Sequence, residues 1–157
     1  MRDQGETVPL VWSSPVTREG LRWSGAPDAR HPAFIRVSRE TAALLISNQD
    51  VVLVRRFSAK EDAHRIVACC VTKSELGGRF GVENHLNIIS GFRGSASSIT
   101  AGELCAYLNS DVVDDWFRAS SGTTQINARD LRDLPIRLRK PARGQHTFEV
   151  LAQPSGA

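Results

Sequence analysis

The chain has 157 residues, 41% apolar and 24% charged, and its 20 Lys and Arg residues against 17 Asp and Glu residues leave a formal net charge of +3. This composition is typical of a soluble globular protein. The length is enough for one domain with a buried core, but it is short for an enzyme that also needs a cofactor-binding sheet. No run of 18 apolar residues occurs and the first ten residues lack the apolar segment of a secretory signal, so we expect a cytoplasmic protein with no membrane association.

The cysteines favour reduced core thiols over a disulfide scaffold or a zinc site. Cys69 and Cys70 are adjacent within an apolar run, and no C-x-x-C motif occurs. Cys105 falls within a predicted helix, where a core position is a better interpretation than a catalytic nucleophile.

Short strands are predicted in the N-terminal third. Residues 8–12 read as a strand, 25–32 as a loop rich in Gly and Pro, and 33–37 as a second strand. Ser38 can then accept a hydrogen bond from the first turn of a helix over residues 39–46.

The middle of the chain carries the strongest strand signals. Residues 51–57 are β-branched and then basic, and residues 65–71 are apolar on both alternating faces, as in a strand covered on both sides. The connection between them is too long for a tight hairpin loop, so it is expected to project Lys60, His64 and Arg65 away from the sheet. A glycine-rich turn over residues 75–81 should precede a strand over 82–90.

A helical section follows. Thr100 and Glu103 form a capping-box pattern, and Ser110 can begin a second helix whose residues 112–117 place apolar side chains on one face. Asn127 can cap a short third helix.

Residues 136–140 alternate like an edge strand. We therefore predict an α+β fold with a mixed, mostly antiparallel sheet and a helical section near the C-terminus. A single domain should span residues 1–140, followed by a loosely ordered tail over 141–157.

Positive charge is concentrated in two places. Residues 129–143 hold six basic and two acidic residues, a local charge of +4, and a second group holds Arg55, Arg56, Lys60 and Arg65. Such clusters can attract phosphates, although a solvated face of a mixed-charge protein is an open alternative.

Catalytic motifs are missing from the sequence. It has no glycine-rich cofactor loop, no Asn-Pro-Pro-aromatic motif of amino-methyltransferases, no P-loop, no serine nucleophile elbow and no pair of His residues at metal-ligand spacing. We therefore expect no catalytic residue, no cofactor and no metal in this chain. An endonuclease, with Asp50, Glu61 and Lys60 near a metal, is retained as a weaker alternative.

Two segments are more polar than folding requires. Residues 83–87 (ENHLN) begin a strand, and their Asn and His side chains can contact bases or phosphates, or else bond to backbone at a strand edge. Residues 121–125 (SGTTQ) precede the helix capped by Asn127. They offer hydroxyls and an amide to DNA, or form a loop that docks that helix.

These segments, taken in order with their spacing, resemble a known family. Residues 51–68, 82–89 and 108–136 are similar to the C-terminal target-recognition region of TaqI-like, adenine-specific type II restriction–modification DNA methyltransferases. The family pattern has VRRFSAKEE, ENHLN, a helix ending in LNS, D-x-x-FR and SGHTQVNATDLR. The resemblance covers about residues 30 to 140. Thr123 stands where the family usually has His, and residues 62–64 replace a more basic stretch.

The resemblance implies DNA reading rather than methyl transfer, because the family's catalytic domain has no counterpart here. The implied partners are double-stranded DNA and a methyltransferase catalytic subunit or domain. The residues expected to contact DNA are Arg55, Arg56, Lys60, Arg65, Asn84, His85, Thr123, Thr124, Gln125, Asn127 and Arg129. An alternative of another class is a protein–protein docking module with Trp12, Trp23 and Trp116 as aromatic anchors.

Overall fold

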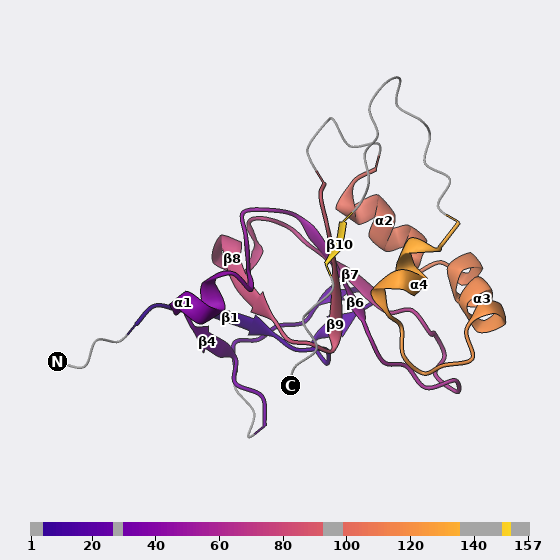
Figure 1. Ribbon diagram of the computed structural model, residues 1–157, viewed down its shortest axis with the longest axis horizontal. Coiled ribbons are helices and arrows are strands. Elements are labelled where there is room, and N and C mark those ends of the chain that lie inside the picture. The colour runs from indigo at the N-terminus through magenta and orange to yellow at the C-terminus, as the bar shows by residue number, and fades with distance from the viewer. Residues whose placement is uncertain (1–4, 27–29, 93–98, 136–148, 152–157) are drawn as a thin grey trace.

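The computed structural model of the chain describes residues 5–26, 30–92, 99–135 and 149–151 (Figure 1). These residues form two four-stranded sheets, a two-stranded hairpin and a group of short helices. The predicted α+β class with mostly antiparallel strands is confirmed. The predicted edge strand over residues 136–140, and four of the basic residues between 136 and 143, lie outside the described ranges.

The central sheet has the strand order β10-β9-β6-β7, and every neighbouring pair is antiparallel. Its strands are β6 (Val51–Arg55), β7 (Ala68–Val71), β9 (Leu86–Ser90) and β10 (Glu149–Leu151). The first three correspond to the strongest strand signals of the sequence, while β10 falls in a segment without a clear pattern.

A second sheet packs behind the first, with the order β4-β1-β8-β5. Its strands are β1 (Thr7–Val11), β4 (Phe34–Arg36), β5 (Leu45–Ser47) and β8 (Arg79–Val82). The pairing of β1 with β8 is parallel, whereas β1–β4 and β5–β8 are antiparallel. Strands β2 (Val16–Thr17) and β3 (Gly20–Leu21) form the separate hairpin.

Two predicted elements differ from the structure. Helix α1 (Arg39–Ala42) begins at the Ser38 cap as expected, but it ends after four residues because the next apolar residues pair with β8 as strand β5. The predicted strand over 82–90 is divided by a turn at residues 83–85, so that β8 lies in one sheet and β9 in the other. In both cases tertiary pairing outweighs the local pattern.

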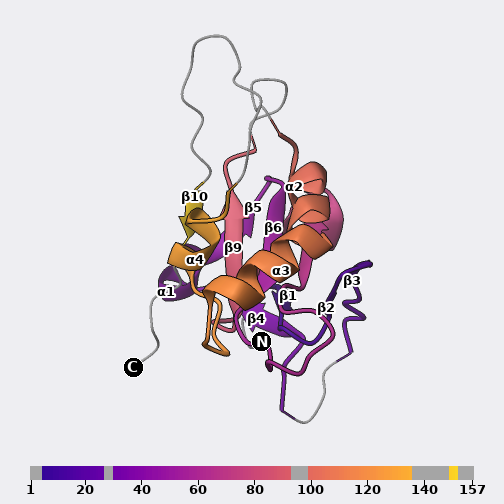
Figure 2. The same ribbon diagram turned by 90° about the vertical axis from the view of Figure 1, so that its right-hand side faces the viewer.

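Three helices cover the outer face of the central sheet (Figure 2): α2 (Ala101–Leu108), α3 (Asp111–Ser120) and α4 (Ala128–Arg132). Their predicted caps are confirmed, since the side chains of Thr100, Ser110 and Asn127 each accept a hydrogen bond from a backbone N–H of the first turn.

Strand β6 contributes to two hydrophobic cores. Val52 and Val54 pack toward the helices, whereas Val51 and Leu53 pack toward the second sheet, and all four are fully buried. This is the two-sided burial expected of an uninterrupted apolar strand.

The three cysteines are free, and Cys69 lies in the core with 1% of its surface exposed. Burial raises the pKa of its thiol to about 12 and that of Cys70 to about 11, so both remain protonated at neutral pH. None of the helices in the described ranges has the length and apolar character needed to cross a lipid bilayer.

Candidate nucleic-acid interface

The polar segments singled out in the sequence meet at one end of β6. The Arg56 N–H donates to the His85 carbonyl at 2.9 Å, and the Arg56 carbonyl accepts from the Ile126 N–H at 2.7 Å. The Ser58 N–H donates to the Thr124 carbonyl at 3.0 Å, and Phe57 pairs with Gln125 in an isolated antiparallel bridge. We call this meeting of residues 55–58, 83–87 and 121–127, with Arg65 bonded between them and Lys60 and Arg129 just beyond them in the chain, the junction. Backbone bonds therefore bring together segments that are far apart in the sequence.

Arg65 lies inside the junction rather than on its surface. Only 2% of the residue is exposed, and its Nε donates to the Ser58 hydroxyl at 2.9 Å. Its guanidinium also donates to the Thr123 carbonyl and lies 5.9 Å from the centre of the Phe117 ring. The predicted projection of Arg65 away from the sheet is therefore wrong. Because its side chain is occupied within the protein, we leave it out of the residues proposed to contact DNA.

Helix α3 holds the β6–β7 connection against the junction. Asp114 accepts hydrogen bonds from the Arg65 N–H and from Arg118 Nε, the latter at 2.7 Å. The Arg118 guanidinium donates in turn to the carbonyls of Lys60 and Asp62, at 2.9 and 2.7 Å. The Asp114 and Arg118 side chains of the D-x-x-FR pattern therefore hold this connection against α3 by hydrogen bonds.

Burial of the Asp114 carboxyl acts to raise its pKa, but the hydrogen bonds from Arg118 and from the Arg65 backbone outweigh burial, and the pKa is lowered.

The ENHLN segment has an inner and an outer part. Asn87 is 4% exposed, and its side-chain amide donates to the Ile126 carbonyl at 2.9 Å. Toward the surface, one carboxylate oxygen of Glu83 accepts from the His85 N–H at 3.0 Å and lies 2.6 Å from His85 Nδ1. The buried end of the segment therefore bonds to the residue that follows the SGTTQ loop, and the other end exposes His85 to solvent.

The two arginines at the end of β6 are held by backbone carbonyls. Arg55 donates from Nε to Val16 at 2.9 Å and from its terminal nitrogen to Ser14 at 3.1 Å. Arg56 donates to the Asn84 carbonyl at 2.7 Å. Within the described ranges neither guanidinium forms an ion pair with a carboxylate, so their positive charges are positioned without being neutralised.

Several side chains on the rim of the junction are open to solvent. Those of Asn84, Lys60 and Thr124, together with the half-exposed Gln125, have no hydrogen-bond partner in the part of the chain that the structure describes. The Arg129 side chain is 87% exposed, and its ion pair with Asp133 is long, at 3.8 Å between Nε and the carboxylate oxygen. These side chains are free to take up a ligand.

Two other predicted residues have structural roles. The Thr123 hydroxyl donates to the Gln125 carbonyl at 2.9 Å, and the Asn127 side-chain oxygen accepts from the backbone N–H groups of Arg129 and Asp130. Thr123 therefore shapes the loop, and Asn127 caps α4.

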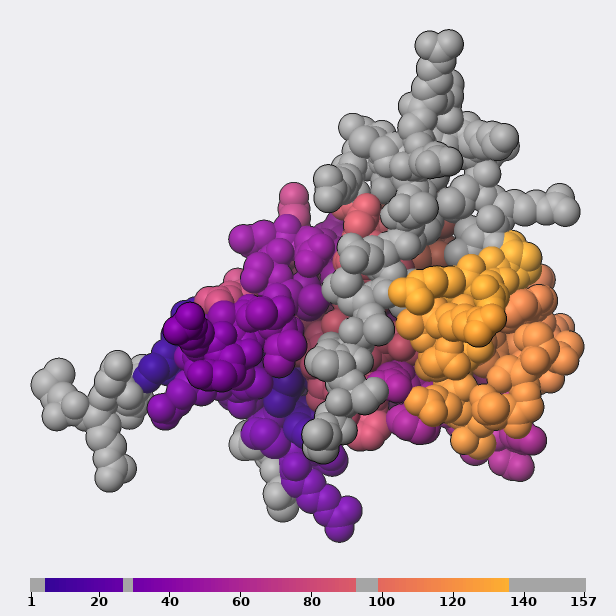
Figure 3. Space-filling view, viewed as in Figure 1, coloured from indigo at the N-terminus to yellow at the C-terminus, as the bar shows by residue number. Residues whose placement is uncertain are grey.

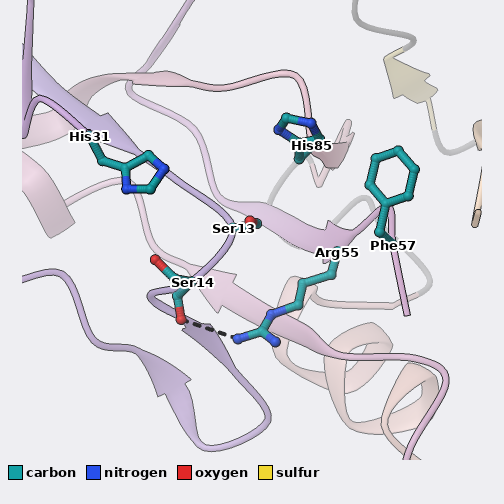
Figure 4. A pocket seen from close by; sticks show the side chains of 6 residues that line it. All are labelled: Ser13, Ser14, His31, Arg55, Phe57 and His85. Carbon is teal, nitrogen blue, oxygen red and sulfur yellow. Dashed lines mark hydrogen bonds between the residues drawn. The ribbon is translucent and has the colours of Figure 1, made fainter. Parts of the chain in front are cut away.

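A cavity of about 630 Å³ opens beside the junction (Figure 4). Its lining residues are Ser13, Ser14, His31, Arg55, Phe57 and His85. Phe57 is 49% exposed, and its ring centre lies 5.4 Å from that of His85. No separate signal in the sequence distinguishes Phe57, because it has the pattern of the last apolar position of a strand.

The aromatic residues considered as protein-docking anchors are largely occupied. Trp12 and Trp23 are half-buried and donate their Nε1–H groups to the carbonyls of Pro32 and Leu10. Trp116 is half-buried against the core beneath the helices. Among the described residues, no group of three or more His, Cys, Asp or Glu side chains is placed to hold a metal ion.

Comparison with known proteins identifies two similar methyltransferases. The chain is 36% identical over 129 residues to the type II methyltransferase M.BsuBI of Bacillus subtilis, a match that covers 82% of this chain and 25% of that protein. It is 33% identical over 140 residues to the type II methyltransferase M.PstI of Providencia stuartii, covering 88% of this chain and 27% of that protein. No protein-family model and no solved structure matches the chain.

The chain is therefore homologous to a part of type II restriction–modification methyltransferases. It spans about a quarter of the length of these relatives. Most of each relative lies outside the similarity.

Proposed function

We propose that the chain is the sequence-specific DNA-recognition module of an adenine-specific type II restriction–modification methyltransferase system. Methyl transfer would be carried out by a separate catalytic domain or subunit. The observation that carries the proposal is the junction, where positioned cations and unpaired polar side chains gather on a surface of a chain homologous to part of type II methyltransferases.

The cations of the junction suit the DNA backbone. Arg55 and Arg56 are fixed by backbone carbonyls, and Lys60 is exposed beside them in the chain. A fixed guanidinium loses little conformational entropy when it meets a phosphate. Contacts of this kind set the position of a protein on duplex DNA without reading its sequence.

The unpaired polar side chains suit base edges. Gln125 can bond bidentately to adenine, and Asn84 and Thr124 offer further donors and acceptors. They are carried by a loop and a turn whose backbones are hydrogen-bonded to β6 and its continuation, so the backbone positions from which they project are defined before DNA arrives. Preorganisation of this kind favours specific recognition.

The proposal is tested by binding of the chain to duplex DNA at low and moderate salt. Binding should weaken steeply as salt increases, because each cation that meets a phosphate releases counterions. Arg56→Ala and Lys60→Ala should each lower affinity for all duplex sequences alike and reduce the salt slope by about 1. The matched control is Arg39→Ala, an exposed arginine on α1 at the opposite end of the molecule (Figure 1), which should leave binding unchanged.

Three outcomes would overturn the proposal. Absence of retention at low salt would favour a protein-docking module, and cleavage of the duplex on addition of magnesium would favour a nuclease. Equal loss of affinity in the Arg39→Ala control would assign binding to general charge rather than to the junction.

A further inference from the structure

The cavity beside the junction combines features that the reading of intact base pairs does not require. It is an open cavity lined by residues from three separate parts of the chain: the segment before β2, the segment before β4, and the junction itself. Its volume of about 630 Å³ falls in the range of pockets that hold small organic molecules. In Figure 4, His31 lies across the cavity from Phe57, with His85 near Phe57.

One wall of the cavity is aromatic and exposed. Phe57 has 49% of its surface in contact with solvent, which makes it one of four large hydrophobic residues described as exposed, together with Phe34, Leu44 and Val112. Its ring and the His85 ring form a tilted pair at 57°. An exposed aromatic ring among polar neighbours is a stacking surface, and nucleobases stack on such rings whatever their sequence.

Another wall of the cavity is cationic. The Arg55 guanidinium is held by a hydrogen bond to the Ser14 carbonyl (Figure 4) and by a second bond to the Val16 carbonyl. Among the described residues no carboxylate lines the cavity. A fixed positive charge and an aromatic surface that line one cavity match the two ends of a nucleotide, a phosphate and a base.

The cavity lies next to the rim of the junction. Phe57 pairs through its backbone with Gln125, and His85 accepts from the Arg56 N–H. DNA lying on the rim of the junction would therefore pass the mouth of the cavity.

We propose that the cavity receives one unstacked nucleotide of the bound DNA, with its base against the rings of Phe57 and His85 and its phosphate beside Arg55. This inference rests on the proposed function and deepens it, because it adds recognition of an extrahelical nucleotide to the reading of a paired duplex.

The test uses three short duplexes that share one sequence. The first is fully paired, the second carries a single extrahelical adenosine, and the third carries an abasic site in place of that adenosine. The full chain should bind the adenosine bulge about tenfold more tightly than the abasic bulge, since one base stacked on an aromatic side chain contributes on that order.

Variants of Phe57 identify the stacking surface. Phe57→Ala should abolish the preference for the adenosine bulge over the abasic bulge, and Phe57→Tyr should retain it because the ring is kept. Since the Phe57–Gln125 pairing is made by backbone, both variants should fold, as thermal unfolding can verify. Phe34→Ala, which removes a comparably exposed ring from β4, is the matched control and should retain the preference.

The outcomes separate the two proposals. Equal affinity for the adenosine and abasic bulges, or a preference that survives in Phe57→Ala, overturns the nucleotide cavity. If the paired duplex still binds with steep salt dependence in that case, the proposed function stands. If none of the three duplexes binds, both proposals fall.

Discussion

The inner and outer layers of the junction use similar side chains in opposite ways. In the inner layer, Arg65 and Asn87 are almost fully buried and bond to carbonyls of the SGTTQ segment and its continuation. On the outer rim, Arg129 and Asn84 are exposed and have weak or no side-chain partners among the described residues. An arginine and an asparagine of the same junction therefore have structural roles in one layer and are available to a ligand in the other.

This contrast shows that each motif combines buried, hydrogen-bonded residues with exposed ones. A polar side chain is costly to bury unless it is fully bonded, so the buried members of each motif must fit one arrangement. That arrangement fixes the backbone from which the rim side chains project. Under the proposed function, recognition at the rim would depend on the inner layer, although the inner residues do not reach the surface.

Among the variants of the two layers, loss of Arg65 should have the largest effect on the free energy of unfolding. Arg65→Ala removes the bonds to Ser58 and Thr123 and leaves the buried Ser58 hydroxyl without this donor, so the free energy of unfolding should fall by about 3 kcal/mol. Urea denaturation measures the change. Lys60→Ala, an exposed change in the same connection, should alter stability by less than about 0.5 kcal/mol; equal effects of the two variants would remove the distinction between the layers.

Asn87→Ala should have a smaller effect of the same kind. It leaves the buried Ile126 carbonyl without its 2.9 Å partner, which costs about 2 kcal/mol. Asn84→Ala, three residues earlier on the rim, is the control for denaturation and should be close to neutral in stability. A destabilisation by Asn84→Ala as large as that by Asn87→Ala would contradict the assignment of these two residues to different layers.

Gln125→Ala should change recognition with little change in stability. If Gln125 reads a base pair, its loss should reduce discrimination at one position by about 1–2 kcal/mol, measured by selection from a random duplex library. Thr17→Ala, in the β2–β3 hairpin, should leave the selected sequence unchanged. An identical selected sequence for Gln125→Ala and the wild-type chain would remove Gln125 from base reading.

Acid should weaken, by a small amount, the hydrogen bonds through which Asp114 holds the β6–β7 connection. The lowered pKa of Asp114 means that its carboxylate stabilises the folded state above the unfolded value of about 3.9, and that this contribution is lost as the pH falls through the lower folded value. Asp114→Asn should therefore flatten the decline of stability below about pH 4, whereas Asp111→Asn at the exposed start of the same helix should leave the decline in place. Urea denaturation across this pH range tests both.

The sequence predicted the parts of the fold that depend on local chemistry. The Thr100, Ser110 and Asn127 caps and the apolar strand over β6 are confirmed, because a cap and a fully apolar strand leave signals within a few residues. The proposed DNA-contacting set remains a prediction.

What the sequence could not predict depends on distant partners. Leu45–Ser47 forms a strand only because β8 lies beside it, and the turn after Val82 places β8 and β9 in different sheets. The burial of Arg65 has the same origin, since its acceptor at Thr123 lies 58 residues further along the chain. From sequence alone, an arginine in a polar connection between strands is predicted to be exposed, because the distant carbonyl that binds it cannot be identified.

The sharing of β6 between the two hydrophobic cores couples them to each other. Its odd-numbered and even-numbered side chains belong to different cores. Unfolding of either the helical side or the second sheet would therefore expose one face of this strand to solvent. The space-filling view (Figure 3) shows the N-terminal elements and the helical elements at opposite sides of the molecule. Domains built in this way tend to unfold in one step, and a disturbance in the N-terminal sheet would reach the loops of the junction through the strand itself rather than through solvent or a hinge.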